Sequence, residues 1–315
     1  MGNRIGIDVG GTNIKIALVN EKGSIIYSNS IPTRAEMGYE YTINNMKEAI
    51  ADLLKETKSN AKDIEGLGFG FPGQIDCQKG IVRLAPNIPG WVDVPIAEIM
   101  EKEFGIPTRV DNDVRCAALG ELNFGAGVGC ENLVCITVGT GIGSGLIING
   151  KLVRGASNAA GEIGHIKLDI QGGPLCGCGD RGCLEAFASG PSIVAMAEEY
   201  IKGGKSTKYR ELANPDITPY IVSEAAKQGD AVAKRIFTIM GEYIGMGLVS
   251  VVNLLNPEKI IIGGGVAAAG DILLNPIKET ILKRSMPISG AAVKVVPAQL
   301  GNTAGVIGAS LLIKS

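Results

Sequence analysis

Residues 4–20 read RIGIDVGGTNIKIALVN, and residues 133–149 read LVCITVGTGIGSGLIIN. In both stretches an apolar strand runs into a turn of glycine and threonine, and a second strand follows. Such strand–turn–strand units form β-hairpins, and these two lie about 130 residues apart. The repetition predicts two related halves that face each other.

Strands and helices alternate along the rest of the chain. Inside the hairpins we expect strands over 4–9, 14–20, 133–138 and 144–149, and elsewhere over 25–31, 64–71, 108–111, 259–262 and 293–297. The expected helices cover 39–58, 96–104, 219–228, 231–256, 276–286 and 303–313, a further helix begins near residue 112, and residues 72–95 form a loop. This alternation indicates an α/β protein.

The composition excludes several classes of protein. The 315 residues are enough for roughly two domains. Thirty Lys and Arg residues against 32 Asp and Glu residues give a net charge of −2, which argues against nucleic acid or an anionic membrane as the main partner. The apolar run over 245–255 is shorter than the ~20 residues that span a bilayer. Asp8 comes too early for a signal peptide, and seven cysteines, an odd number, argue against a secreted disulfide framework. We therefore expect a cytoplasmic protein.

The two hairpin turns are candidates for binding phosphate. Asp8 ends the first strand, and Gly10, Gly11 and Thr12 follow it. An acidic residue beside exposed backbone N–H groups suits a hydrated Mg²⁺ next to nucleotide phosphates. In the second turn, glycines allow amides to approach phosphate oxygens and Thr140 can donate its hydroxyl. The alternative is a pair of tight hairpins that need glycine, but the matched pair favours a phosphate clamp.

Asp111, Asn112 and Asp113 stand together where a strand ends and a helix starts. The positive helix terminus stabilises a carboxylate, so we expect Asp113 to be ionised at neutral pH. Such a carboxylate can accept the proton of a substrate hydroxyl that attacks a γ-phosphate. The alternative role is helix capping, but capping needs only one of the three residues.

One segment has the spacing of a metal site. His165, the only histidine, precedes a cysteine cluster formed by Cys176, Cys178 and Cys183. Three thiolates and one imidazole make a closed tetrahedral zinc site of the structural kind. The alternative is a redox or fortuitous cluster.

Two acidic residues flank this segment. Glu162 lies three residues before His165, and Glu185 lies two residues after Cys183, so a zinc knuckle would fix both carboxylates. Rigid carboxylates discriminate the hydroxyls of a sugar, because an absent hydroxyl leaves them buried and unpaired. Asn87 could contribute in the same way. The alternative is that both glutamates are surface or supporting residues.

These motifs together resemble the ROK family of sugar kinases and repressors over nearly the whole chain. The motifs that carry the resemblance are Asp8-x-Gly-Gly-Thr12, Phe71-Pro-Gly73, Asn87-x-x-Gly90-Trp91, Asn112-Asp113 with Ala117-Ala-x-Gly-Glu121, Gly139-Thr-Gly-x-Gly-x-Gly145, Gly161-Glu-x-Gly-His165, Cys176-x-Cys-Gly-x-x-Gly-Cys-x-Glu185, Gly263-Gly-Gly-Val266 and Leu300-Gly-Asn-x-Ala-Gly305. The cysteine segment is the most specific. Asp111 departs from the Glu that is frequent at its position, and Thr303 from the usual Asp.

The resemblance implies an actin-like ATPase fold, in which two ribonuclease-H-like domains surround a central cleft. Residues 1–123 with 301–315 would form the small domain, and residues 124–300 the large domain with the zinc knuckle. Carried over position by position, Asp113 would be the base. The sugar would contact Gly73, Asn87, Asn112, Asp113, Glu162, His165 and Glu185, and the nucleotide would lie along Asp8, Gly10, Gly11, Thr12, Thr140, Gly141, Gly264 and Gly265.

The implied activity is an ATP:hexose 6-phosphotransferase with Mg²⁺ and a structural Zn²⁺, active as a homodimer or homotetramer. Glucose is the expected acceptor, because Asn87-x-x-Gly90-Trp91 resembles the glucokinase members, while fructose or an N-acylhexosamine stays open. The rival function is a sugar-responsive DNA-binding repressor, which needs a helix-turn-helix module. With the first strand expected at Arg4, we expect no such module. An intact Asp113 and both turns argue against a catalytically silent sugar-binding protein.

Overall fold

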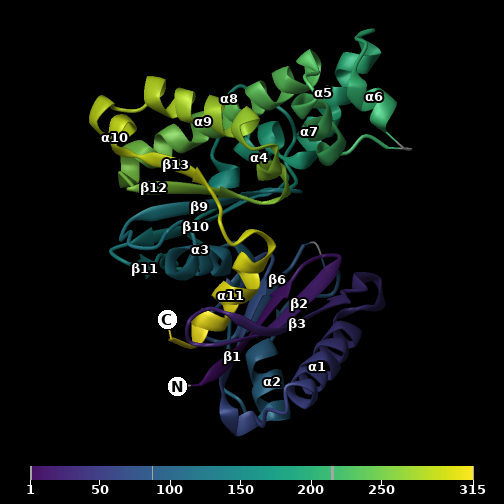
Figure 1. The fold of residues 1–315 in the computed structure, drawn as a ribbon, viewed down its shortest axis with the longest axis vertical. Helices are drawn as coiled ribbons and strands as arrows, with labels where there is room; N and C mark the ends of the chain where they lie inside the picture. The colour runs from purple at the N-terminus through teal and green to yellow at the C-terminus, as the bar shows by residue number, and fades with distance from the viewer. Residues whose placement is uncertain (1, 87, 214–215, 315) are drawn as a thin grey trace.

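The computed structural model describes residues 2–86, 88–213 and 216–314, and it contains two five-stranded sheets with the same topology (Figure 1). The first sheet has the order β3-β2-β1-β4-β8, and the second has the order β11-β10-β9-β12-β13. In each sheet the central strand has an antiparallel hairpin partner on one side and parallel strands on the other. The shared topology confirms the two related halves and the actin-like fold.

Except for the two-residue strand β11, the strands of these two sheets occupy the regions that the sequence predicts. The first sheet consists of β1 (Asn3–Val9), β2 (Asn13–Val19), β3 (Ile25–Pro32), β4 (Ile64–Phe71) and β8 (Thr108–Asn112). The second consists of β9 (Leu133–Val138), β10 (Ile142–Ile148), β11 (Lys151–Leu152), β12 (Lys259–Gly263) and β13 (Lys294–Pro297).

The strand register shows which residues of the two halves correspond. Asp8 pairs with Lys15 across β1 and β2, and Thr137 pairs with Gly143 across β9 and β10. Asp8 and Thr137 each stand one residue before the end of the central strand. Thr137 is therefore the counterpart of Asp8 in the second half.

Helices cover both sheets and supply the cores. In the first half these are α1 (Tyr39–Glu56) and α2 (Ile96–Phe104); in the second half they are α4 (Leu184–Ala188), α5 (Gly190–Lys202), α6 (Lys208–Leu212), α7 (Pro219–Lys227), α8 (Ala231–Leu255), α9 (Asp271–Arg284) and α10 (Pro287–Ala292). Of the helices described, α8 alone has the length and apolarity of a membrane span. Half of the most apolar stretch of α8 is buried in the protein. Ile236, Met240 and Ile244 lie in the core, so packing against the rest of the protein explains why α8 is so apolar.

Two helices cross at the joint between the halves (Figure 1). Helix α3 (Asp113–Phe124) packs on β9 and β10 of the second sheet, whereas α11 (Ala304–Leu311) packs on β1 and β4 of the first. The two helices are in close contact: a Cβ at Gly120 would collide with the Ala304 carbonyl, and one at Gly308 with the Cys116 carbonyl. Helix α3 thus follows the first sheet in the chain and packs on the second, whereas α11 follows the second sheet in the chain and returns to the first. We propose the expected domain division, residues 1–123 with 301–315 and residues 124–300, with these helices as its joint.

Glu121 binds both segments of the chain that connect the two halves. Its buried carboxylate accepts hydrogen bonds from the backbone N–H of Ala126, at 2.8 Å, just after α3. It also accepts from the N–H groups of Gln299 and Leu300, at 3.2 and 2.8 Å, just before α11. One side chain thus holds the chain at both places where it passes from one half to the other.

Three sequence expectations are corrected. The expected loop over 72–95 holds a small sheet of β5 (Gln74–Asp76), β6 (Ile81–Leu84) and β7 (Val92–Val94), with strands too short for a visible alternation. Helix α9 begins at Asp271, five residues before Pro276, so this proline lies inside the helix. Strand β10 begins at Ile142, because the glycines of the second turn also pair with β9.

We expect Glu121→Gln to lower the free energy of unfolding by about 2 kcal/mol. The glutamine NH₂ group accepts no hydrogen bond, so at least one backbone N–H would lose its acceptor. Urea denaturation measures the change. The matched control is Glu103→Gln, which breaks a surface ion pair with Lys47 and should change stability by less than about 0.5 kcal/mol. Equal stability of the two variants would contradict the role of Glu121.

Candidate functional site

A cavity of about 500 Å³ is lined by both halves, at the ends of β1, β9 and β12 and beside α3 and α11. Its lining includes four of the residues predicted to bind or react, Asp8, Asp113, Gly264 and Gly265. Gly10, Gly11, Thr12, Thr140 and Gly141 are not among the lining residues. The cavity therefore brings together the two acidic residues and the glycine turn after β12.

Asp8 lies at the edge of this cavity next to a lysine. Its Oδ2 is 4.0 Å from Nζ of Lys15, which also donates a hydrogen bond to the Asn302 carbonyl at 3.1 Å. Helix α11 passes so closely that a Cβ at Gly305 would stand 2.7 Å from the Asp8 carboxylate. Burial raises the pKa of Asp8, and the Lys15 cation partly opposes that rise.

Asn112 caps α3 and leaves Asp113 available. Its side-chain oxygen accepts from the N–H groups of Val114 and Arg115, at 3.0 and 3.2 Å, and its amide donates to the Gly73 carbonyl at 3.3 Å. The capping interpretation is thus correct for Asn112. Asp113 is the first residue of the helix and lines the cavity.

The pKa of Asp113 is raised to about 6, against an ordinary value of 3.8. Burial is the largest cause, and the carboxylates of Asp8 and Glu162 add to it, while the N–H of Val114 lowers the pKa. The sequence argument from the helix terminus predicted stabilisation of the charge, but desolvation outweighs that effect. Asp113 is still ionised in most molecules at neutral pH.

The second hairpin turn is tied to Glu185. Its Oε2 accepts a hydrogen bond of 2.8 Å from the N–H of Ile142, directly after the turn. A Cβ at Gly141 would collide with this carboxylate, so a larger residue there would displace the Glu185 side chain. Thr140 is exposed at the tip of the turn. The structure therefore joins a predicted sugar contact to a predicted phosphate turn.

The glycine turn after β12 packs against the end of β9. Gly264 has φ +86°, and a Cβ there would collide with the backbone of Val138. Only glycine combines this conformation with this contact. Gly264 and Gly265 are exposed toward the cavity.

Four side chains form a cluster with the chemistry of a zinc site. One ligand atom from each of His165, Cys176, Cys178 and Cys183 lies within 4.8 Å of every other. The Sγ atoms of Cys178 and Cys183 are 3.7 Å apart, and Cys176 Sγ is 3.7 Å from Nδ1 of His165. Zinc–sulfur bonds of about 2.3 Å in a tetrahedron place two sulfurs about 3.8 Å apart. The cluster therefore fits Zn²⁺, with Nδ1 of His165 as the ligand nitrogen.

The remaining predicted sugar contacts stand close to this cluster. Glu162 precedes the short helical turn that ends at His165, and the His165 N–H donates to the Glu162 carbonyl at 3.0 Å. Glu162 is exposed, and its charge acts on the pKa of Asp113. Gly73 meets Asn112, as described above, and Asn87 lies outside the described residues.

Among the lining residues that sequence reasoning did not place in the site, three have side chains that can bind a polar ligand: Lys15, Thr137 and Asn302. Lys15 is the cross-strand neighbour of Asp8, and Thr137 is the counterpart of Asp8 in the second half. Aligning the two hairpins with each other would have found Thr137. Asn302 reaches the site only through the packing of α11.

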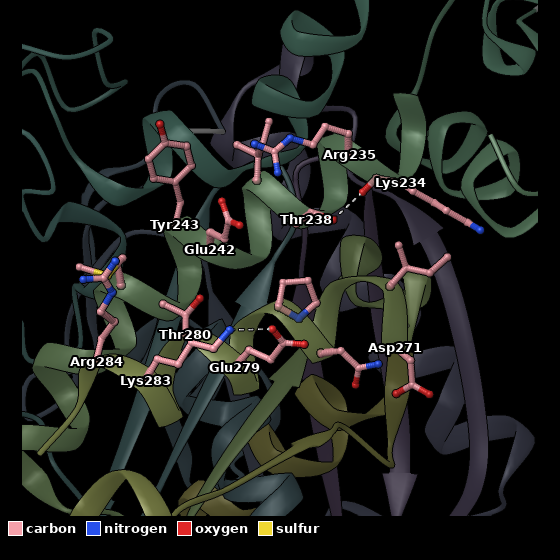
Figure 2. A pocket seen from close by; sticks show the side chains of 15 residues that line it. Lys234, Arg235, Thr238, Glu242, Tyr243, Asp271, Glu279, Thr280, Lys283 and Arg284 are labelled. Atoms are coloured by element: carbon pink, nitrogen blue, oxygen red, sulfur yellow. Dashed lines mark hydrogen bonds and ion pairs between the residues drawn. The ribbon is translucent and has the colours of Figure 1, made fainter. Parts of the chain in front are cut away.

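A second cavity of about 920 Å³ lies between α8 and α9, away from these residues (Figure 2). Its charged side chains carry both signs, and Lys283 pairs with Glu279 along α9 at 3.2 Å. None of the predicted site residues lines it. The smaller cavity between the halves is therefore the candidate site.

Comparison with protein families finds that the model described as "ROK family" matches residues 4–315. A protein named glucokinase from Halalkalibacterium halodurans is 40% identical, over 98% of this chain and 94% of that protein. A xylose repressor from Caldicellulosiruptor bescii is 34% identical, over 100% of this chain and 79% of that protein.

Among solved structures, a ROK family glucokinase from Streptomyces griseus in complex with glucose and AMPPNP is similar with a TM-score of 0.84. It is 35% identical, over 99% of each chain. The similarity thus extends over both halves and the cavity between them.

We expect freshly purified protein to carry one zinc ion per chain, and Cys178→Ala to lose it and melt at a lower temperature, because structural zinc stabilises its fold. Cys178 is exposed, so this substitution leaves no buried cavity. Elemental analysis and thermal melts measure both effects. The control Cys130→Ala, outside the cluster, should keep its zinc. A zinc-free wild-type protein would refute the assignment.

Proposed function

This chain belongs to the ROK family, and we propose that it is an ATP-dependent kinase that transfers a phosphoryl group to the 6-hydroxyl of glucose. The observation that carries the proposal is the shared cavity, in which Asp113 faces Asp8 and the glycine turn after β12. A base on one side and a site for phosphates on the other are what phosphoryl transfer requires.

The relatives support glucose as the acceptor. Proteins named glucokinase are 40% and 36% identical to this chain over nearly its full length. The similar structure from Streptomyces griseus holds glucose and AMPPNP together. Fructose and N-acylhexosamines are the competing acceptors that an assay must compare.

Asp113 is the proposed base. Its pKa of about 6 leaves it ionised at neutral pH yet closer to neutrality than an ordinary aspartate, which suits a group that must take up a proton. The hydrogen bond from the Val114 N–H, at 2.9 Å, holds one carboxylate oxygen. The other oxygen would accept the proton of the 6-hydroxyl as that oxygen attacks the γ-phosphate.

The zinc knuckle would hold in place the side chains that form one wall of the sugar site. With Nδ1 of His165 directed at Cys176, its other ring nitrogen stays available for a sugar hydroxyl. Glu162 and Glu185 flank the knuckle in the chain, and Gly73, Asn87 and Asn112 complete the proposed wall. A missing hydroxyl would leave these groups unpaired, which is the source of selectivity.

The nucleotide would lie along Asp8, the two hairpin turns (Gly10, Gly11, Thr12, Thr140 and Gly141) and the turn of Gly264 and Gly265. Mg²⁺ held by Asp8 would neutralise charge on the phosphates. Lys15 places a cation beside them. We also carry over from the family resemblance a homodimer or homotetramer in the cytoplasm.

We expect Asp113→Asn to lower kcat for glucose by at least about a thousandfold, with glucose binding retained, because the amide accepts no proton. A coupled assay of ADP release over glucose, fructose, mannose and N-acylhexosamines measures turnover, and calorimetry measures binding. The wild-type protein should prefer glucose. Turnover within about tenfold of wild type in the variant would remove Asp113 from its role.

The same panel separates the proposal from its rival. A protein that binds sugars yet turns over none of them with ATP would behave as the repressor branch of the family, which includes the xylose repressor at 34% identity. Turnover with glucose at the highest kcat/KM supports the kinase. A higher value for another hexose would reassign the substrate.

The raised pKa of Asp113 predicts the pH dependence. The base works only when deprotonated, so kcat/KM for glucose should be constant above pH 7 and fall as the pH drops through about 6, with a slope of one. A profile that falls only near the ordinary aspartate value of 3.8 would contradict the environment described for Asp113.

A further inference from the structure

Asp111 lies two residues before the proposed base, Asp113, and the proposed reaction does not use it. Its carboxylate is fully buried, at 0% exposure. Oδ1 accepts from the Asn112 N–H at 2.8 Å and from Nη1 of Arg115 at 3.1 Å, and Oδ2 accepts from Nε of Arg154 at 2.7 Å. A buried carboxylate held by two guanidinium groups is a rigid centre with matched charge.

The arginines extend this centre to the loop before Glu162. Nη2 of Arg115 donates to the carbonyls of Asn158 and Ala160, at 2.8 and 2.9 Å. The next carbonyl, of Gly161, accepts from the Ser144 hydroxyl at 2.5 Å. Because consecutive carbonyls are held, the backbone that enters Glu162 has little freedom.

The loop is also held from the first half. The Cys77 thiol, just after β5, donates to the side-chain oxygen of Asn158 at 3.2 Å. Arg154 starts the same loop and reaches Asp111 at the end of β8. Residues 154–161 therefore belong to the second half but are fastened to residues of the first half beside Asp113.

We propose that Arg154 and Arg115, paired with Asp111, are positioning residues that set Glu162 for the sugar opposite Asp113. The inference rests on the proposed function, because Glu162 is a proposed sugar contact. Arg115 follows Asp113 by two residues in α3, so one rigid cluster determines both the start of the base helix and the approach to Glu162. Neither arginine has to touch substrate for this role.

The test is a double-mutant cycle of Arg154→Met and Glu162→Gln. Alone, Arg154→Met should raise KM for glucose about tenfold or more, because a small displacement of a binding group is costly. KM for ATP should stay within about twofold of wild type. In the Glu162→Gln background the same change should raise KM for glucose less than about twofold, since two residues that act through one contact are not additive.

Two further variants separate positioning from general stability. Arg4→Met removes another buried arginine, paired with Glu65 at 3.7 Å at the far end of β1, and should leave both KM values unchanged even if it lowers the melting temperature. Arg154→Lys keeps the charge and should recover part of the glucose affinity. It also replaces Arg154→Met in the cycle if the methionine variant does not fold.

Equal effects of Arg154→Met in both backgrounds, or an equal rise of KM for ATP, would overturn the positioning role. Wild-type turnover in the same assay tests the proposed function separately. If the wild-type protein turns over no hexose, the same cycle on the glucose dissociation constant, measured by calorimetry, still tests the coupling of Arg154 to Glu162.

Discussion

The close contact of α3 with α11 determines most of the geometry at the joint. Gly120 and Gly308 let the two backbones meet, and no larger residue fits at either position. As a result α11 runs past Asp8 through Gly305, while α3 presents Asp113 to the same cavity. Burial of Asp113 in this joint, together with the charge of Asp8, raises the pKa of Asp113. The chemistry of the proposed base follows from how closely two helices cross.

Buried carboxylates hold the chain together around this crossing. Glu121 binds backbone N–H groups on both connections, and Asp111 binds two arginines that reach the loop before Glu162. Removing one partner of such a group leaves the other desolvated and unpaired. The joint therefore combines apolar contact with a few charges whose partners come from distant parts of the sequence.

Local sequence patterns predicted most of the strands and the start of α3, but they did not predict the contacts between residues that are far apart in the chain. The apolar strands and the capped start of α3 were predictable, because alternation and capping act between near neighbours. The strands of residues 74–94 were missed since they are short, and Pro276 was read as a helix start because proline favours that position. The cysteine cluster was predictable from spacing alone. Lys15 and Arg154 were not, because cross-strand and cross-loop packing brings them to their partners.

Glu185 belongs to two structures at once. One oxygen lies 3.8 Å from the Cys176 sulfur, and the other holds the N–H of Ile142 at the edge of the second turn. If the cluster holds Zn²⁺, Cys176 is a thiolate that donates no hydrogen bond, so binding or loss of the metal would change the surroundings of this carboxylate beside the second turn. In the proposed kinase, the zinc content of the protein and the second turn of the nucleotide site would therefore be linked through a single side chain.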